Sequence, residues 1–216
     1  MSATLGLSTP PRQLPDPLPA IHPLPEYAAA GELAARYNDM KEVLQVPWMG
    51  VVTIAYAHYP NFFGELWRGL RPLATSRPFI AAVRELRTYC EAEVMQLAPP
   101  PLTERLGDNG YGEREIDNIR AMIEIFSHGN FPYLMIASLT RGLLLGGSFG
   151  KADNTAPPFE GRHAPDVSVP FLLMERHHAD APIPAVYDDI MATLGLPFVN
   201  TDYRALARWP SYFALA

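Results

Sequence analysis

The stretch LPFVNTDYRALARWP, residues 196–210, decides the fold because an earlier part of the chain repeats its pattern. Its counterpart is VPWMGVVTIAYAHYP, residues 46–60, which lies 150 positions earlier without a gap. Identical pairs at this offset extend beyond the two stretches: Tyr37/Tyr187, Asp39/Asp189, Leu44/Leu194, Pro47/Pro197, Ala55/Ala205, Ala57/Ala207, Pro60/Pro210 and Phe63/Phe213. An ungapped internal match of this length is typical of a repeated structural unit.

The later copy carries an acid where the earlier copy has a hydrocarbon. If the later stretch is a helix, Asp202 shares its apolar face with Ala205 and Trp209, and the matching earlier residue is Val52. Burial on that face would raise the pKa of the carboxyl group toward the range of a general base. The alternative interpretation is a helix cap, because residues 200–202, Asn-Thr-Asp, are all good N-cap types.

The rest of the chain has helical periodicity and no alternating strand pattern, so we predict an all-α fold. We expect one helix over residues 48–59, a break near Pro72, and a long helix that starts at Ser76. A further break at His128-Gly129-Asn130 would make Asn130 the N-cap of a helix over 131–145. Asn130 and the free N–H groups of that first turn would then form a small anion-binding site. A plain cap is the alternative.

We predict four segments along the chain. They are a proline-rich arm over residues 1–26, a helical repeat over 27–149, a linker over 150–184 and the start of a second repeat over 185–216. The second copy ends soon after the counterpart of Pro60, whereas the first continues through several more helices. We therefore expect either a longer natural chain or self-association, for example as a homodimer, to cover the second repeat.

Composition excludes several classes of partner and chemistry. A net charge of −6 gives no reason to expect nucleic acid or an anionic membrane as a partner, and no apolar run is long enough for a membrane span. The default expectation is a cytoplasmic protein. The single cysteine, Cys90, excludes an internal disulfide and lies on the apolar face of its helix. His177-His178 with Asp180 could suggest a metal, but adjacent histidines point apart, so no metal is expected.

Four motifs together resemble the group I 2-haloacid dehalogenases, all-α enzymes that accept both D- and L-2-haloacids. The motifs occur in the family's order: Val46-Pro47-Trp48, Tyr59-Pro60-Asn61-Phe62, Gly129-Asn130-Phe131-Pro132-Tyr133-Leu134 and Thr201-Asp202-Tyr203-Arg204-Ala205-Leu206. The likeness covers residues 27–216. It implies two tandem helical repeats with the active site between them, a 2-haloacid and water as the reactants, and no cofactor.

The resemblance also implies roles for particular residues. Asp202 matches the catalytic aspartate, which activates a water to displace halide directly from Cα with no covalent ester. Asn130 matches a second residue near the water. The expected substrate-binding residues are Trp48, Val51, Tyr133, Thr201 and Ser76. Two of these depart from the family, since Val51 stands in place of a pocket phenylalanine, and Ser76 in place of the threonine of a Thr-x-x-x-Glu pair whose glutamate is absent here.

Two other function classes remain open from the sequence alone. The chain could be a non-catalytic helical module, or a hydrolase of another type that keeps the same scaffold. A redox enzyme of the alkylhydroperoxidase type is disfavoured, because Cys90 has no partner cysteine with which to form a redox-active pair. Chloride release from 2-chloropropionate distinguishes the dehalogenase from the other classes.

Overall fold

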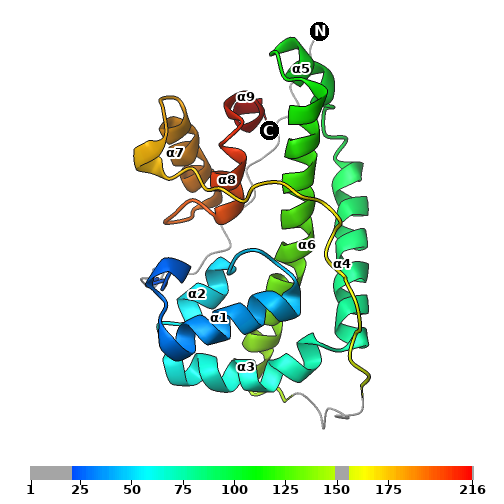
Figure 1. Cartoon of the computed structure of the whole chain (residues 1–216), viewed down its shortest axis with the longest axis vertical. Coiled ribbons are helices and arrows are strands. Elements are labelled where there is room, and N and C mark those ends of the chain that lie inside the picture. Colours follow the sequence, from blue (N-terminus) through cyan, green and yellow to red (C-terminus); the bar gives the residue numbers. More distant parts are fainter. Residues whose placement is uncertain (1–20, 149–155, 216) are drawn as a thin grey trace.

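The all-α class is confirmed by the computed structural model, which describes residues 21–148 and 156–215 (Figure 1). Most of the predicted proline-rich arm lies outside these residues. The helices are α1 Gly31–Leu44, α2 Val51–Tyr56, α3 Pro60–Ala74, α4 Arg77–Gln96, α5 Thr103–Asp108, α6 Glu113–Leu144, α7 Ile183–Leu194, α8 Thr201–Leu206 and α9 Pro210–Leu215, with short 3₁₀ turns η1 Glu26–Ala28 and η2 Arg176–His178. Among the described residues, the one β interaction is an isolated bridge between Ser76 and Pro158.

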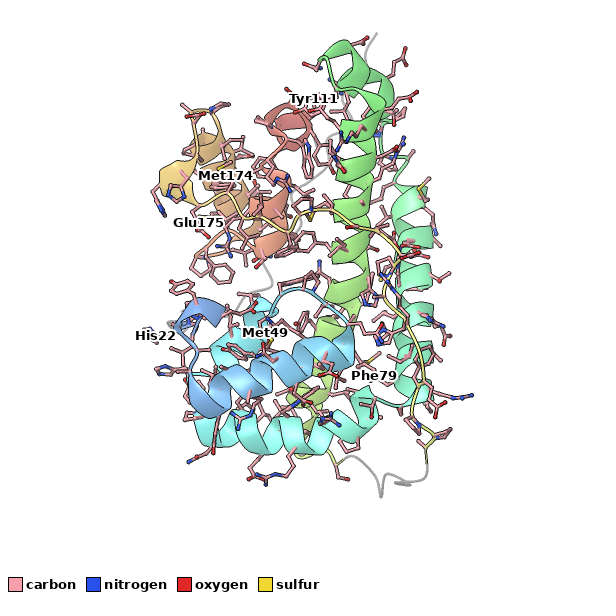
Figure 2. The ribbon with its side chains drawn as sticks, in the orientation of Figure 1. His22, Met49, Phe79, Tyr111, Met174 and Glu175 are labelled. Carbon is pink, nitrogen blue, oxygen red and sulfur yellow. The ribbon has the colours of Figure 1, made fainter. Side chains whose placement is uncertain are left out.

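Helix α6 is the longest element, and both parts of the repeat pattern pack against it. It contacts α4 along its length, α2 from the first part of the chain and α8 from the last part. In Figure 1, α1, α2 and α3 surround one half of α6, while α8 and α9 lie beside the other half. The hydroxyl of Tyr111, just before α6, accepts a hydrogen bond of 3.3 Å from the N–H of Ser211 in α9; Tyr111 is labelled in Figure 2.

The predicted break at His128-Gly129-Asn130 is wrong, because α6 runs unbroken from Glu113 to Leu144. Gly129 does not end a helix; it allows the indole of Trp48 to pack closely against α6. A Cβ atom built on it would lie 2.3 Å from Cη2 of Trp48, so only glycine fits beneath the indole. Pro132 is buried inside the helix, which continues past it despite the missing N–H. Asn130 is therefore a mid-helix residue and caps nothing.

One other helix boundary differs from expectation, and two agree. The break near Pro72 is confirmed within two residues, since α3 ends at Ala74 and Pro72 lies in its last turn. The expected helix over 48–59 is shortened to α2, which leaves Trp48 in the preceding loop. The start of α4 is confirmed: the hydroxyl oxygen of Ser76 accepts a hydrogen bond of 3.3 Å from the N–H of Phe79.

Hydrogen bonds recur at the offset of 150 that the sequence suggests. The hydroxyl of Tyr37 donates to the carbonyl of Leu24 at 2.7 Å, and the hydroxyl of Tyr187 donates to the carbonyl of Met174 at the same distance. The N–H groups of these two acceptor residues form a second equivalent pair: Leu24 to the carbonyl of Ile54 at 3.0 Å, and Met174 to the carbonyl of Arg204 at 2.9 Å. The two segments therefore share one local architecture.

Residues 156–174 form a mostly extended segment that we call the strap. It runs along α4, crosses α6 and reaches α8, as the yellow ribbon in Figure 1 shows. Gln45 follows the last residue of α1 and has a left-handed backbone conformation. Its side chain forms three hydrogen bonds with the strap. Gln45 donates to the carbonyl of Gly161 at 2.9 Å and accepts from the N–H groups of His163 and Ala164 at 2.8 and 3.0 Å. The strap is thus fixed to the first helix before it reaches the last ones.

No helix in the described residues combines the length and apolar character that crossing a membrane requires.

Candidate active site

A cavity of about 270 Å³ lies where α2, α6 and α8 meet. Six of the seven site residues expected from the sequence line it: Trp48, Val51, Asn130, Tyr133, Thr201 and Asp202. The other lining residues are Gly50, Val52, Leu134, Ala137 and Asn200. The structure therefore brings together residues that are up to about 150 positions apart in the sequence.

The cavity has two matching walls of opposite character. One wall is the first turn of α2 with its preceding residue, Gly50 to Val52, and the other is the first turn of α8 with its preceding residue, Asn200 to Asp202. These triplets are equivalent at the offset of 150. The earlier copy supplies glycine and hydrocarbon, while the later copy supplies an amide, a hydroxyl and a carboxyl group. The cavity lining therefore combines an apolar triplet from the earlier copy with a polar triplet from the later copy.

The pKa of the Asp202 carboxyl group is raised above its ordinary value of 3.8, chiefly because burial disfavours the charged form. Hydrogen bonds from main-chain N–H groups and the positive charge of Arg204 act in the opposite direction but do not cancel the effect of burial. Arg204 is itself paired with Glu175, with 2.6 Å between Nη1 and Oε1, which reduces its pull on Asp202. The carboxyl group of Asp202 therefore stays protonated to a higher pH than that of a free aspartate.

Trp48 forms the aromatic end of the cavity. Its indole is 4% exposed and is held by Phe126, at 4.6 Å between ring centroids, and by Phe171 of the strap, at 5.6 Å and an interplanar angle of 12°. The edge of the indole lies against the backbone of Gly129. Contacts with two aromatic rings and with Gly129 leave the indole little freedom to move.

Tyr133 lines the cavity, and its hydroxyl group forms a hydrogen bond with the main chain. The hydroxyl donates a hydrogen bond of 2.6 Å to the carbonyl of Trp48. Burial raises the pKa of the phenol well above its usual value of 10.0, so it stays protonated. A Cβ atom on Gly50 would lie 2.6 Å from the ring, so the loop passes directly over Tyr133.

Asn130 reaches the cavity from the middle of α6. The expected anion site of free N–H groups does not form there, because the main chain around Asn130 is inside a continuous helix. Its side chain is exposed and lines the cavity. Only the side-chain amide, with donors on nitrogen and an acceptor oxygen, is available for a ligand.

Ser76 lies apart from this cavity. Its hydroxyl donates to the carbonyl of Leu73 at 2.6 Å and caps α4, and the residue is fully buried. The structure gives Ser76 a role in shaping the start of α4 and does not bring it near Asp202.

Asn200 is a cavity residue that the sequence analysis interpreted only as a cap. It precedes α8, yet its side chain makes no capping hydrogen bond. Its Oδ1 atom is buried and has no hydrogen-bond partner among the described residues. A buried amide oxygen without a partner costs free energy, which suits a group that binds a ligand or water. The signal in the sequence was the polar residue in the place of Gly50.

A larger cavity, of about 500 Å³, lies elsewhere, between the strap, the end of α1 and α6. Its lining lacks Asp202, so we assign the candidate active site to the smaller cavity, where the shifted carboxyl group lies. Among the described residues, no cluster of His, Cys, Asp or Glu could hold a metal ion.

Comparisons with known proteins agree on one family. The chain is 49% identical over 210 residues to an (R)-2-haloacid dehalogenase from Rhizobium sp. (strain NHG3), covering 95% of this chain and 80% of the relative. It is 41% identical over 209 residues to an (R)-2-haloacid dehalogenase from Pseudomonas putida, covering 94% and 69%. No family model matches the chain.

A solved structure matches the fold as well as the sequence. The complex of a D-2-haloacid dehalogenase with L-LA superposes with a TM-score of 0.80 at 40% identity, covering 93% of this chain and 71% of the solved one. The helical fold and the extended sequence identity agree. The chain belongs to the family of 2-haloacid dehalogenases, hydrolases that act on carbon–halide bonds.

Proposed function

We propose that this chain hydrolyses short 2-haloalkanoic acids to 2-hydroxy acids and halide, with Asp202 as general base. The observation that carries the proposal is the carboxyl group of Asp202, which is half-buried, has a raised pKa and lines a cavity together with several apolar residues. The (R)-2-haloacid dehalogenases at 49% and 41% identity support the substrate class.

The reaction proceeds by direct displacement at Cα. A water in the cavity loses a proton to Asp202 while its oxygen forms a bond to Cα of the haloacid. The carbon–halogen bond breaks at the same time, and its electron pair leaves with the halide. Because the oxygen attacks from the side opposite the halogen, the configuration at Cα is inverted. An (R)-2-haloacid thus gives an (S)-2-hydroxy acid.

The side-chain amides orient the water and the substrate. The buried Oδ1 of Asn200 has a free acceptor site for a proton of the attacking water, on the same wall as Asp202. Asn130 approaches from α6, and its NH₂ group is a donor for a carboxylate oxygen of the substrate. None of the described residues that line this cavity is a lysine, arginine or histidine, so neutral donors, including the Thr201 hydroxyl, bind the carboxylate.

The apolar wall receives the alkyl group and the halogen. It consists of Trp48, Val51, Val52, Leu134, Ala137 and the ring of Tyr133. Val51 takes the place of a larger aromatic residue in the resembling family, which leaves more room beside Trp48. A dry wall of this kind also keeps bulk water from the base, which maintains its raised pKa.

We further propose that the site lies between two helical repeats, over residues 27–149 and 185–216. The equivalent hydrogen bonds of Tyr37 and Tyr187, and the paired walls of the cavity, support this division. Each repeat then supplies one wall, and only the later one carries the base.

Halide release tests the proposed function. The purified chain is incubated with (R)- and (S)-2-chloropropionate separately, and chloride and the two lactate enantiomers are measured. We expect chloride and (S)-lactate from the (R) substrate; the (S) substrate tests the expectation that both enantiomers react. If neither acid releases chloride from a folded sample, the proposal is wrong.

A single-turnover experiment in heavy-oxygen water tests the nucleophile. With enzyme in excess, direct attack by water puts the label into the first molecules of lactate. Label in Asp202, together with unlabelled lactate from the first turnover, would instead indicate an ester between the aspartate and the substrate.

A further inference from the structure

The aromatic wall of the active-site cavity is backed by a second, larger cavity. Phe171 lines the cavity of about 500 Å³ on one side, and its ring lies parallel to the indole of Trp48 on the other. Trp48 in turn lines the cavity that contains Asp202. The two stacked rings are therefore the partition between the two spaces.

The position of Phe171 is fixed by the helix region that carries the base. On one side of it, the guanidinium of Arg208 donates to the carbonyl of Pro170 at 2.6 Å. On the other, the N–H of Met174 donates to the carbonyl of Arg204 at 2.9 Å. Arg204 lies in α8 and Arg208 just beyond it. Met174 and Glu175 are labelled in Figure 2 where the strap arrives beside α8.

The loop that carries Trp48 is also attached to the strap. Gln45 binds the strap at residues 161–164, and Trp48 follows Gln45 by three residues. The strap thus connects the loop of Trp48 to the helix of Asp202. The ring of Phe171 stacks on the indole of Trp48, with 5.6 Å between the ring centroids.

We propose that Phe171 is a specificity-determining residue, which limits the length of the alkyl chain of the 2-haloacid by holding Trp48 against the active-site cavity. The inference rests on the proposed function, since it concerns the substrate of the same site. Without the phenyl ring, the indole can move toward the larger cavity and open space beside Asp202. A one-methylene difference in a hydrophobic pocket changes kcat/KM by about 10- to 200-fold.

The test compares 2-bromopropionate with 2-bromohexanoate, which share a halogen and differ in chain length. The ratio of kcat/KM for the longer acid to that for the shorter acid is measured in the wild type, Phe171→Ala and Phe171→Leu. We expect the ratio to rise about tenfold or more in Phe171→Ala and by less in Phe171→Leu. The leucine variant keeps most of the apolar volume, so it provides a folded sample if the alanine variant does not fold.

The matched control is Phe159→Ala, in the same strap. Phe159 lies under the guanidinium of Arg84, at 5.3 Å, and against His163, and it does not line the cavity of Asp202. Its substitution removes the same ring without touching Trp48, and the ratio should stay at the wild-type value. An equal rise in Phe159→Ala would overturn the inference, because general loosening of the strap would then be the cause.

Two further results separate the inference from the proposed function. If both Phe171 variants hydrolyse 2-bromopropionate but keep the wild-type ratio, the inference is wrong while the proposed function stands. If the wild type releases no bromide from either acid, the proposed function fails, and the inference fails with it.

Discussion

The hydroxyl of Tyr133 lies 2.6 Å from the carbonyl oxygen of Trp48 and donates a hydrogen bond to it. This bond joins the middle of α6 to the loop before α2, across 85 positions of the chain. The same loop passes over the Tyr133 ring at Gly50 and places the indole of Trp48 on Gly129. Two glycines and one phenol thus determine where the aromatic wall of the cavity stands.

Replacing Tyr133 with phenylalanine should lower the free energy of unfolding by about 1–3 kcal/mol, because the buried carbonyl of Trp48 would lose its partner. Urea denaturation measures the loss. Tyr89→Phe is the control, since Tyr89 is exposed on α4 and its substitution should change stability by less than about 0.5 kcal/mol. Equal stabilities of the Tyr133 and Tyr89 variants would mean that the hydrogen bond between Tyr133 and the carbonyl of Trp48 does not stabilise the fold.

Asp202→Asn should reduce kcat for 2-chloropropionate by about 10²- to 10⁴-fold, the range expected when a general base is removed. The side chain keeps its shape, so the helical circular dichroism should not change. Asp189→Asn is the matched control: Asp189 is an exposed acid on α7 and the counterpart of Asp39, and its loss should leave kcat near the wild-type value. Near-normal turnover in Asp202→Asn would remove the residue from the mechanism.

The pH dependence of kcat/KM should follow the raised pKa of Asp202. The base must be ionised, so activity falls as pH drops through a midpoint that lies above the ordinary aspartate value of 3.8. Initial rates of halide release across the acid range give this midpoint. A midpoint at or below 3.8 would show that burial does not set the ionisation of the working base.

The stability of the Asp202→Asn variant should depend on pH with a defined sign. A pKa raised on folding contributes stability that is fully present below the unfolded value and is lost as pH rises through the folded value. The wild type therefore loses stability relative to the asparagine variant as pH rises from about 3.8 through the folded pKa. Thermal melts of both proteins from pH 3 to 8 check this. The prediction would be contradicted if the Asp202→Asn variant were less stable than the wild type and the difference grew as pH rose to 8.

The sequence predicted the fold class, and it selected six residues that line one cavity, for identifiable reasons. Helical periodicity and the offset of 150 are local signals, and both identify elements without knowledge of packing. The acid in place of Val52 is also a local signal, and it led to Asp202. What failed at Gly129 was the assumption that a glycine in this position ends a helix. The reason for this glycine lies across the molecule, in the indole of Trp48, and no local pattern contains it.

The same limit explains Asn200 and the strap. Asn200 is a residue type that often caps helices. Only the structure reveals that its side-chain amide makes no capping hydrogen bond to α8. Residues 156–174 have no periodicity, so the sequence predicted a linker. Their role comes from single contacts, such as Gln45 with Gly161 and Phe171 with Trp48, between residues more than 100 positions apart.

Gly129→Ala should destabilise the protein, and Gly142→Ala in the same helix should stabilise it. A methyl group on Gly129 would enter the indole of Trp48, and overpacking of this kind costs about 1–3 kcal/mol. A methyl group on Gly142 meets nothing within 4 Å, so only the helix propensity of alanine remains, a gain of about 0.5–1 kcal/mol.

Urea denaturation of both glycine variants decides between a packing role and a flexibility role for Gly129. If the residue served as a hinge in α6, alanine at either position would stiffen the helix, and both variants would gain stability. Opposite signs are expected because Trp48 covers only one of the two glycines. Gly129→Ala should also lower kcat/KM for 2-chloropropionate, since the displaced indole lines the same cavity as Asp202. A Gly129→Ala protein as stable and active as the wild type would show that the indole can move freely, against the close packing described above.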